Sequence, residues 1–309
     1  MTDANSNTTK IVSEALHEHR SLWGDVWRQF RTHKGAVIGV IVFSFIVLGV
    51  MFGPFFHDLD PTFLDIRNKN QAPSFAHPMG TDNLGRDMLA QVMAGGQVSL
   101  LVGVTAMLLS LFVGTLVGVF AGFFKSLDGI LMRLTDLFLA LPLLPLLLVI
   151  IMLFRDTLRS AFGPETGIFF LIVFVIGITS WMQTARIVRG EVLALKEQEF
   201  IIAAHSIGTR SHRIISRHIL PNVLSPILVS ATLGIANAII TESALSFLGL
   251  GFPSDFPTWG RLLFDGVNFM QLTPSRVIWP GLAISLTVLS VNYIGDGLRD
   301  ALDPRIRGR

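Results

Sequence analysis

The stretch VSLLVGVTAMLLSLFVGTLVGVFAGFF, from Val98 to Phe124, runs for 27 residues without an aspartate, glutamate, lysine or arginine. An α-helix rises about 1.5 Å per residue, so this stretch is long enough to cross a hydrocarbon core of roughly 30 Å. Backbone amides in lipid must be hydrogen-bonded within the segment, and a barrel strand would instead alternate over about ten residues. The stretch therefore predicts a membrane-spanning helix.

Six such uncharged runs cover 128 of the 309 residues. They are Gly35–Phe56, Val98–Phe124, Leu137–Phe154, Gly167–Ala185, Ile219–Thr241 and Val277–Gly295. The whole chain is 51% hydrophobic and only 15% charged, whereas soluble proteins are about 25% charged. The sequence predicts an all-α polytopic membrane protein with six transmembrane helices. The prolines of the third run, Pro142 and Pro145, predict a kink there.

The basic residues indicate the orientation of these helices. If the N-terminus is cytoplasmic, 17 of the 24 lysines and arginines fall in inner segments and 7 in outer ones. The positive-inside bias therefore predicts that both termini are cytoplasmic. A formal net charge of only +2 gives no reason to expect nucleic acid as a partner, and the lipid bilayer is the expected surroundings.

This orientation divides the chain into segments. Residues 1–34 are a cytoplasmic tail without a cleavable signal, containing an amphipathic helix from Val12 to Phe30 that could lie on the inner membrane surface or against a partner. The remaining segments are the first helix 35–56, the extracytoplasmic loop 57–97, a five-helix core 98–296 with a cytoplasmic coupling loop 186–218, and the tail 297–309.

A search for chemistry finds no catalytic set. None of the five lysines follows a glycine, so the phosphate-binding P-loop of an ATPase cannot form in this chain. The chain has no cysteine, and its histidines are not spaced for a compact metal site. No aspartate, glutamate, lysine, arginine or histidine lies inside the six runs, which disfavours a secondary transporter. The chain is therefore expected to be non-catalytic and to bind no cofactor or metal.

The loop between the fourth and fifth runs is the most informative. Its pattern predicts a short helix, a turn at Gly208 and a basic second helix that enters the membrane before Pro221. Phe200, Ala203, Ala204 and Ile207 fall on one face of the first helix. That apolar face could dock in a groove of a cytosolic partner or lie on the lipid surface, and periodicity leaves both readings open.

The same loop resembles the signature of permease subunits of ATP-binding-cassette importers, in which an Ala pair is followed by Gly and then by Leu-Pro. Further motifs resemble the second permease subunit of dipeptide, oligopeptide and nickel importers. The matching positions are Ala203, Ala204, Gly208, Leu220 and Pro221, together with the segments Gly80–Asp87, Leu139–Pro142, Glu242–Gly251, Pro257–Gly260 and Gly295–Arg305. Ile202 stands where the signature has Glu, and Glu199 lies three residues upstream.

The resemblance implies a type I importer permease fold in the bacterial inner membrane. It implies a heterodimer with a homologous second permease, two ATPase subunits that hold ATP and Mg, and an extracytoplasmic solute-binding protein. The loop would then couple to the ATPases through Glu199, Phe200, Ala203, Ala204, Ile207, Gly208, Arg210, Leu220 and Pro221.

The cargo expected from this resemblance is a di- or oligopeptide, with nickel chelates, glutathione or opines as alternatives. A secondary transporter is a less favoured alternative to the importer itself. Asn237, a scattered polar group within the fifth run, is a candidate for the translocation pathway. Glu242 is expected to close the fifth helix at its outer end and to anchor it or to face a substrate vestibule. The two long outer loops are the expected docking surface for the binding protein.

Overall fold

The structure is a computed structural model that describes residues 22–302, and this part of the chain is helical with no β-strand. The helices in chain order are α2 (Leu22–Thr32), α3 (Lys34–Phe56), α4 (Met88–Phe123), α5 (Lys125–Ala140), α6 (Leu143–Phe162), α7 (Pro164–Lys196), α8 (Glu199–Ser206), α9 (Ser211–Ile214), α10 (Leu220–Phe247), α11 (Trp259–Val267) and α12 (Ser275–Leu302). A 3₁₀ turn covers Ile66–Asn68, and a π-helical turn covers Ile215–Ile219.

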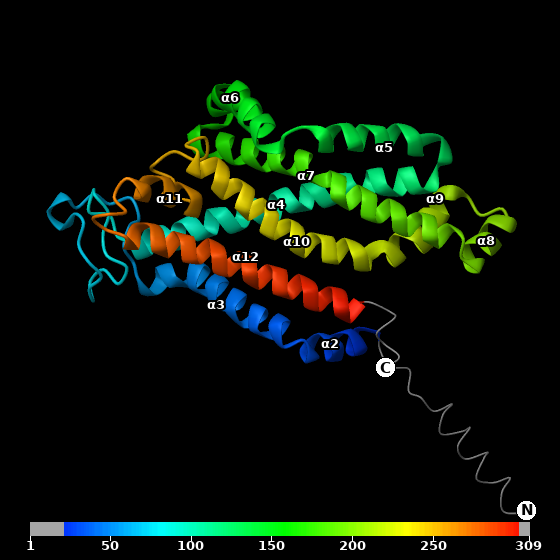
Figure 1. Cartoon of the computed structure of the whole chain (residues 1–309), viewed down its shortest axis with the longest axis horizontal. Helices are drawn as coiled ribbons and strands as arrows, with labels where there is room; N and C mark the ends of the chain where they lie inside the picture. The colour runs from blue at the N-terminus through cyan, green and yellow to red at the C-terminus, as the bar shows by residue number, and fades with distance from the viewer. Residues whose placement is uncertain (1–21, 303–309) are drawn as a thin grey trace, which may run out of the picture.

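The long helices run side by side along the molecule (Figure 1). Two ends result: the α8 end, where α2, α8 and the end of α12 lie, and the α11 end, where α11 and the segment 57–87 lie. Five helices are long and apolar enough to cross a membrane, and the bent pair α5–α6 brings the number to six if it counts as one span. This agrees with the predicted six-span, all-α architecture.

The third span differs from the prediction. The helix expected over 137–154 is broken, because α5 ends at Ala140, α6 begins at Leu143 and their axes differ by 88°. Proline has no N–H and disfavours the helical conformation in the residue before it. Leu141 is accordingly extended, with φ −74° and ψ 136°. Pro142 therefore ends a helix rather than kinking one.

Small residues bring α4 and α7 together. A Cβ atom on Gly114 would lie 2.7 Å from the carbonyl oxygen of Trp181, and one on Gly118 would lie 2.7 Å from that of Ala185. Helices pack without a hydrophobic driving force in lipid, so close backbone approach supplies the van der Waals contact that holds them. The absence of side chains at these two positions is therefore what lets α4 and α7 approach so closely.

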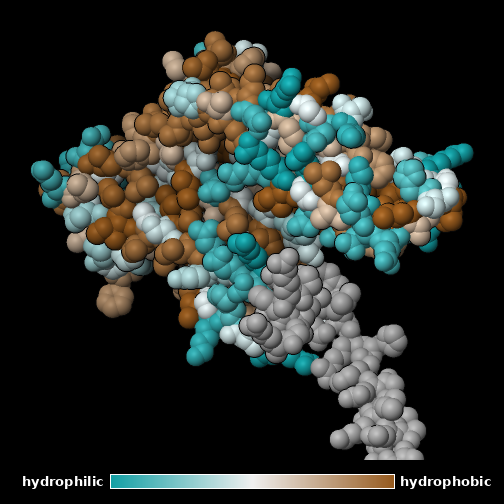
Figure 2. All heavy atoms as spheres, turned by 45° about the vertical axis from the view of Figure 1, so that its right-hand side comes forward, coloured by the Kyte–Doolittle hydropathy of each residue, from teal (hydrophilic) through white to brown (hydrophobic). Residues whose placement is uncertain are grey.

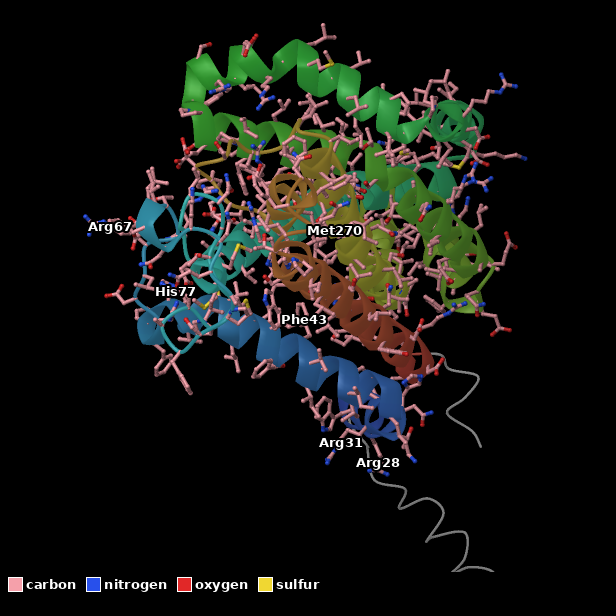
Figure 3. All side chains as sticks on the ribbon, turned by 60° about the vertical axis from the view of Figure 1, so that its left-hand side comes forward. Arg28, Arg31, Phe43, Arg67, His77 and Met270 are labelled. Carbon is pink, nitrogen blue, oxygen red and sulfur yellow. The ribbon has the colours of Figure 1, made fainter. Side chains whose placement is uncertain are left out.

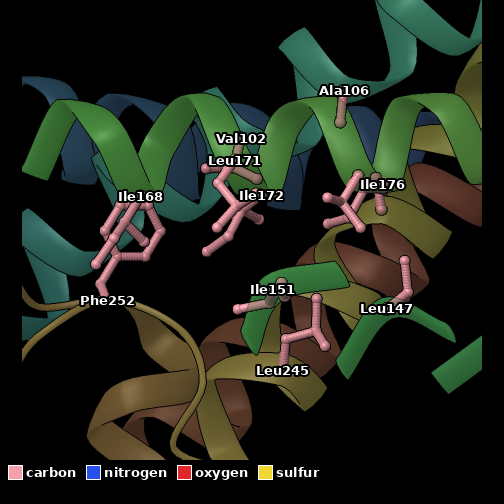
Figure 4. Close-up of a cluster of buried hydrophobic side chains, with 12 residues drawn as sticks. Val102, Ala106, Leu147, Ile151, Ile168, Leu171, Ile172, Ile176, Leu245 and Phe252 are labelled. Atoms are coloured by element: carbon pink, nitrogen blue, oxygen red, sulfur yellow. The ribbon is translucent and has the colours of Figure 1, made fainter. Parts of the chain in front are cut away.

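The largest apolar cluster lies where α4, α6 and α7 meet the end of α10 (Figure 4). α7 contributes one side of the cluster, and Leu147 and Ile151 of α6 approach it from the other (Figure 4). Phe252 is fully buried there. The bend before α6 is thus fixed by packing as well as by Pro142.

Several predicted segment boundaries move. α4 begins at Met88 rather than near residue 98, because the Asp87 side chain accepts a hydrogen bond from the N–H of Ala90 and caps the helix there. α7 continues to Lys196, so residues 186–196 of the predicted coupling loop are helical. α12 continues to Leu302, into the segment predicted as a tail. Composition marks the lipid-crossing part of a helix, whereas caps and packing decide where the helix ends.

The amphipathic N-terminal helix is confirmed in part. α2 covers Leu22–Thr32, and residues 12–21 of the prediction lie outside the described residues. Val26 and Phe30 are buried against Ala36 and Ala301, whereas Trp27 is 60% exposed. Part of the apolar face is therefore covered by the chain itself, at the junction of α3 and α12.

Candidate functional site

A groove of about 1350 Å³ opens between α7 and α10. α10 lines it from Pro221 to Thr241, twenty residues that rise about 30 Å, the thickness of a hydrocarbon core. The break between α5 and α6 lines one side, and Arg299 and Leu302 of α12 line it near the α8 end. A single continuous groove thus runs along the helix that would cross the membrane.

The groove lining is mostly apolar with neutral polar groups spaced along it. The polar lining residues of α7 and α10 are Thr179, Ser180, Gln183, Thr184, Asn222, Ser225, Ser230, Asn237 and Thr241. Among the described residues, Glu191 and Arg299 are the charged residues in the lining. Such a surface offers hydrogen bonds to a polar solute without selecting one sign of charge along most of its length.

The two predicted pathway residues are placed differently. Asn237 lines the groove and is exposed to it. Glu242 is fully buried and does not line the groove, so it does not face a vestibule there. α10 continues past it to Phe247.

Glu242 instead joins three helices at the α11 end. Its carboxylate accepts hydrogen bonds from Ser246 Oγ at 2.7 Å and from Ser99 Oγ of α4 at 3.1 Å. Ser99 Oγ in turn accepts from the backbone N–H of Trp259, the first residue of α11, at 3.2 Å. Buried polar groups that are fully paired rigidify their surroundings. The motif residues around Glu242 and Trp259 therefore serve helix packing.

The Gly80–Asp87 motif forms a second buried network at the α11 end. Arg86 Nε donates to Asp82 Oδ2 at 2.6 Å, and another Arg86 nitrogen donates to the carbonyl of Ser254 at 3.2 Å. Asp87 accepts from His57 at 2.9 Å and from His77 at 2.8 Å. The motif therefore ties the outer segment to α3, α4 and the approach to α11, a role the sequence pattern alone did not reveal.

The predicted turn in the coupling loop is confirmed. Gly208 follows α8 with φ +79°, a left-handed conformation that favours glycine and ends many helices. The N–H of Thr209 donates to the carbonyl of Ala204 at 3.1 Å and closes the turn.

The helix after the turn continues into α10 without a break, and Pro221 lies in its first turn. A proline inside a helix clashes with the carbonyl four residues earlier. The wide π-helical turn at Ile215–Ile219 precedes it, and the N–H of Leu220 donates to Ile215. The widened turn accommodates Leu220-Pro221, so the motif marks the entry into the long helix.

The faces of α8 differ in one residue from the prediction. Phe200 is 46% exposed and Ile207 83% exposed, and Ala203 is also exposed. Ala204 is buried together with Ile201, in a cluster with Ile214, Ile219 and Val223. Ile201 and Ala204 face the bundle, where α8 packs against α7 and α9. The exposed apolar face is therefore Phe200, Ala203 and Ile207, named here the α8 face.

The other predicted coupling residues are also exposed. Glu199, Arg210, Leu220 and Pro221 are exposed near the α8 end. Hydrophilic side chains gather at that end, beside a broad hydrophobic surface (Figure 2). Among the described residues, no group of three or more His, Asp or Glu side chains is arranged to hold a metal ion.

Comparison with known families identifies the class of this chain. Residues 114–308 match the binding-protein-dependent transport system inner membrane component family, and residues 21–73 match the N-terminal transmembrane domain of oligopeptide transport permease C. The chain belongs to the first of these families, as a permease and a multi-pass inner membrane protein.

Individual relatives are similar along nearly their whole length. The oligopeptide transport system permease protein OppC of Bacillus subtilis is 38% identical over 96% of this chain and 93% of the relative. OppC of Escherichia coli K12 is 39% identical over 98% of both chains. The dipeptide transport system permease protein DppC of Alkalihalophilus pseudofirmus is 38% identical over 93% of this chain and 91% of the relative.

Proposed function

We propose that this chain is a membrane-spanning subunit of an ATP-driven importer for dipeptides and oligopeptides. The observation that carries the proposal is the groove, which follows α10 for about 30 Å with a neutral lining. A peptide backbone presents amide donors and acceptors whatever its side chains, and the spaced hydroxyl and amide groups suit it. The names of the relatives, which are oligopeptide and dipeptide permeases, support the same cargo.

The α8 end faces the cytoplasm in this proposal. Arg28 and Arg31 extend from α2 there, at the opposite end of α3 from His77 and Arg67 (Figure 3). Arg210, Arg213 and Arg217 belong to the same end, so the positive-inside bias favours this orientation. The segment 57–87 and α11 would then meet an extracytoplasmic solute-binding protein.

The groove is open along one side, where lining residues such as Leu224 and Ile187 are 49% and 45% exposed. A homologous second permease that covers this side would complete a passage between two subunits. Two cytoplasmic ATPases would bind the α8 faces of the two permeases and hydrolyse ATP with Mg. This chain would bind neither ATP nor Mg itself.

Coupling would run through α8 as a lever. The helix is fixed to the bundle by Ile201 and Ala204 and presents the α8 face outward. ATP binding would draw the ATPases together, and the attached helices would change the opening of the groove. This requires that the ATPases bind the two lever positions with different affinity, because equal affinity shifts no equilibrium.

The test is reconstitution of this chain with its second permease, both ATPases and the binding protein in proteoliposomes. We expect uptake of a labelled tripeptide that requires both ATP and the binding protein. Liposomes without ATP or without binding protein are the matched controls. Uptake of a nickel chelate but of no peptide would contradict the cargo, and uptake driven by an ion gradient without ATP would contradict the importer.

A further inference from the structure

The groove carries fixed charge at its α8 end. Glu191 lies on α7, twelve residues beyond Thr179 and so about 18 Å further along the groove. Arg299 lies in the last turn of α12. The rest of the described lining is uncharged. Two opposite charges therefore stand at the end where a solute would leave.

Both side chains are exposed, and neither makes an ion pair with another described residue. Several of their charged neighbours on the same helices are engaged. Arg189 is held by Asp128 with two hydrogen bonds, the longer 2.7 Å, and Arg186 is paired with Asp136. Asp300 lies 3.8 Å from His33. Glu191 and Arg299 are thus left available to a ligand.

We propose that Glu191 and Arg299 bind the ionised groups of a peptide as it leaves the groove. This inference rests on the proposed function. A free peptide is a zwitterion with an ammonium and a carboxylate, and withdrawing both from water into a neutral groove is costly. One acidic and one basic partner at the exit offset that cost for both ends, whereas a single charge would favour one sign of peptide.

The two residues also act on charged peptide side chains. Glu191 attracts a lysine side chain and Arg299 attracts a glutamate side chain, so each residue promotes the exit of one class of peptide. Ion pairs exposed to solvent are weak, so each variant is expected to change relative uptake by about two- to fivefold. The simpler alternative is that both are solvated helix-end charges that touch no cargo.

The test measures initial uptake of Ala-Ala-Ala, Ala-Lys-Ala and Ala-Glu-Ala by the complete importer at saturating binding protein. The variants are E191Q and R299Q, with E191D and R299K as charge-conserving partners. D296N and R31Q are matched controls, because Asp296 and Arg31 are exposed charges at the α8 end that do not line the groove.

We expect E191Q to lower the ratio of Ala-Lys-Ala to Ala-Glu-Ala uptake and R299Q to raise it, with E191D and R299K close to wild type. An unchanged ratio in both neutral variants would overturn the inference, as would an equal change in D296N and R31Q. If the wild type takes up peptides, neither of these outcomes contradicts the proposed function. A wild-type importer that takes up none of the three peptides would overturn the proposed function itself.

Discussion

A set of acidic side chains at the α11 end of the bundle is buried and paired, whereas the α8 face at the other end is exposed. Asp82, Asp87 and Glu242 are each at least 96% buried and accept several hydrogen bonds. Phe200 and Ile207 project from the α8 face instead. The difference teaches that the buried acidic side chains at one end hold segments of this chain together, whereas the α8 face at the other end is largely exposed and suits a partner.

The contrast makes a prediction about substitutions. Those at the α11 end should reduce the stability of the folded chain, and those on the α8 face should reduce coupling without reducing stability.

Gly260→Val should give the largest loss of stability. A Cβ atom at Gly260 would lie 2.5 Å from the backbone of Ser243, so α11 would have to move away from α10. Overpacking of this kind costs about 1–3 kcal/mol, and a clash with backbone places the substitution at the upper end. The loss of stability is measured by thermal unfolding of the purified chain in detergent. Gly281→Ala is the control, because its Cβ atom would lie 3.8 Å from Leu263, an ordinary van der Waals contact. Equal melting temperatures for the two variants would contradict the close packing of α11.

Glu242→Ala should destabilise the same end by a smaller amount. It leaves the hydroxyls of Ser99 and Ser246 without their acceptor, and an unpaired buried polar group costs about 1–3 kcal/mol. Glu242→Gln keeps one acceptor oxygen and should retain more stability. If both variants had the melting temperature of the wild type, the three-helix network would not hold the α11 end together.

Ile207→Ala should leave thermal stability unchanged and weaken the response of the ATPases. The side chain is 83% exposed and supports no packing within the chain, but an anchor at an interface carries about 1 kcal/mol or more of binding energy. Substrate-stimulated ATP hydrolysis by the complete importer is the measurement, with an expected loss of roughly five- to tenfold. Ile202→Ala is the matched control, since Ile202 is 51% exposed on the opposite side of α8. An equal loss in both variants would contradict the assignment of the α8 face.

The membrane-spanning pattern and the turn at Gly208 were predictable from sequence. Lipid excludes charge from long segments, so five of the six uncharged runs coincide with single long helices. A glycine after a short apolar helix similarly specifies a left-handed turn by local sterics.

Features that depend on distant partners were not predictable in this way. The burial of Glu242 depends on Ser99 of α4 and, through it, on Trp259 of α11. Ala204 turns inward because Ile214 and Ile219 provide a surface for it. Asp136 of α5 pairs with Arg186 of α7, fifty residues away in the sequence. In the third run Pro142 predicted an interruption of the helix, but the size of the bend, 88°, depends also on the packing of α6 against α7.

The central claim is that the groove along α10 is the path of the cargo, and cysteine accessibility tests it most directly. The chain has no native cysteine, so Ser225, Ser230 and Asn237 can each be replaced by a single cysteine without background. In the complete importer these three positions should react with a small water-soluble thiol reagent, and binding protein loaded with peptide should change their rates under ATP turnover. Ala236→Cys, at a position 1% exposed on the same helix, is the control and should stay unreactive. Groove positions that remain as unreactive as Ala236→Cys in every state would contradict the account.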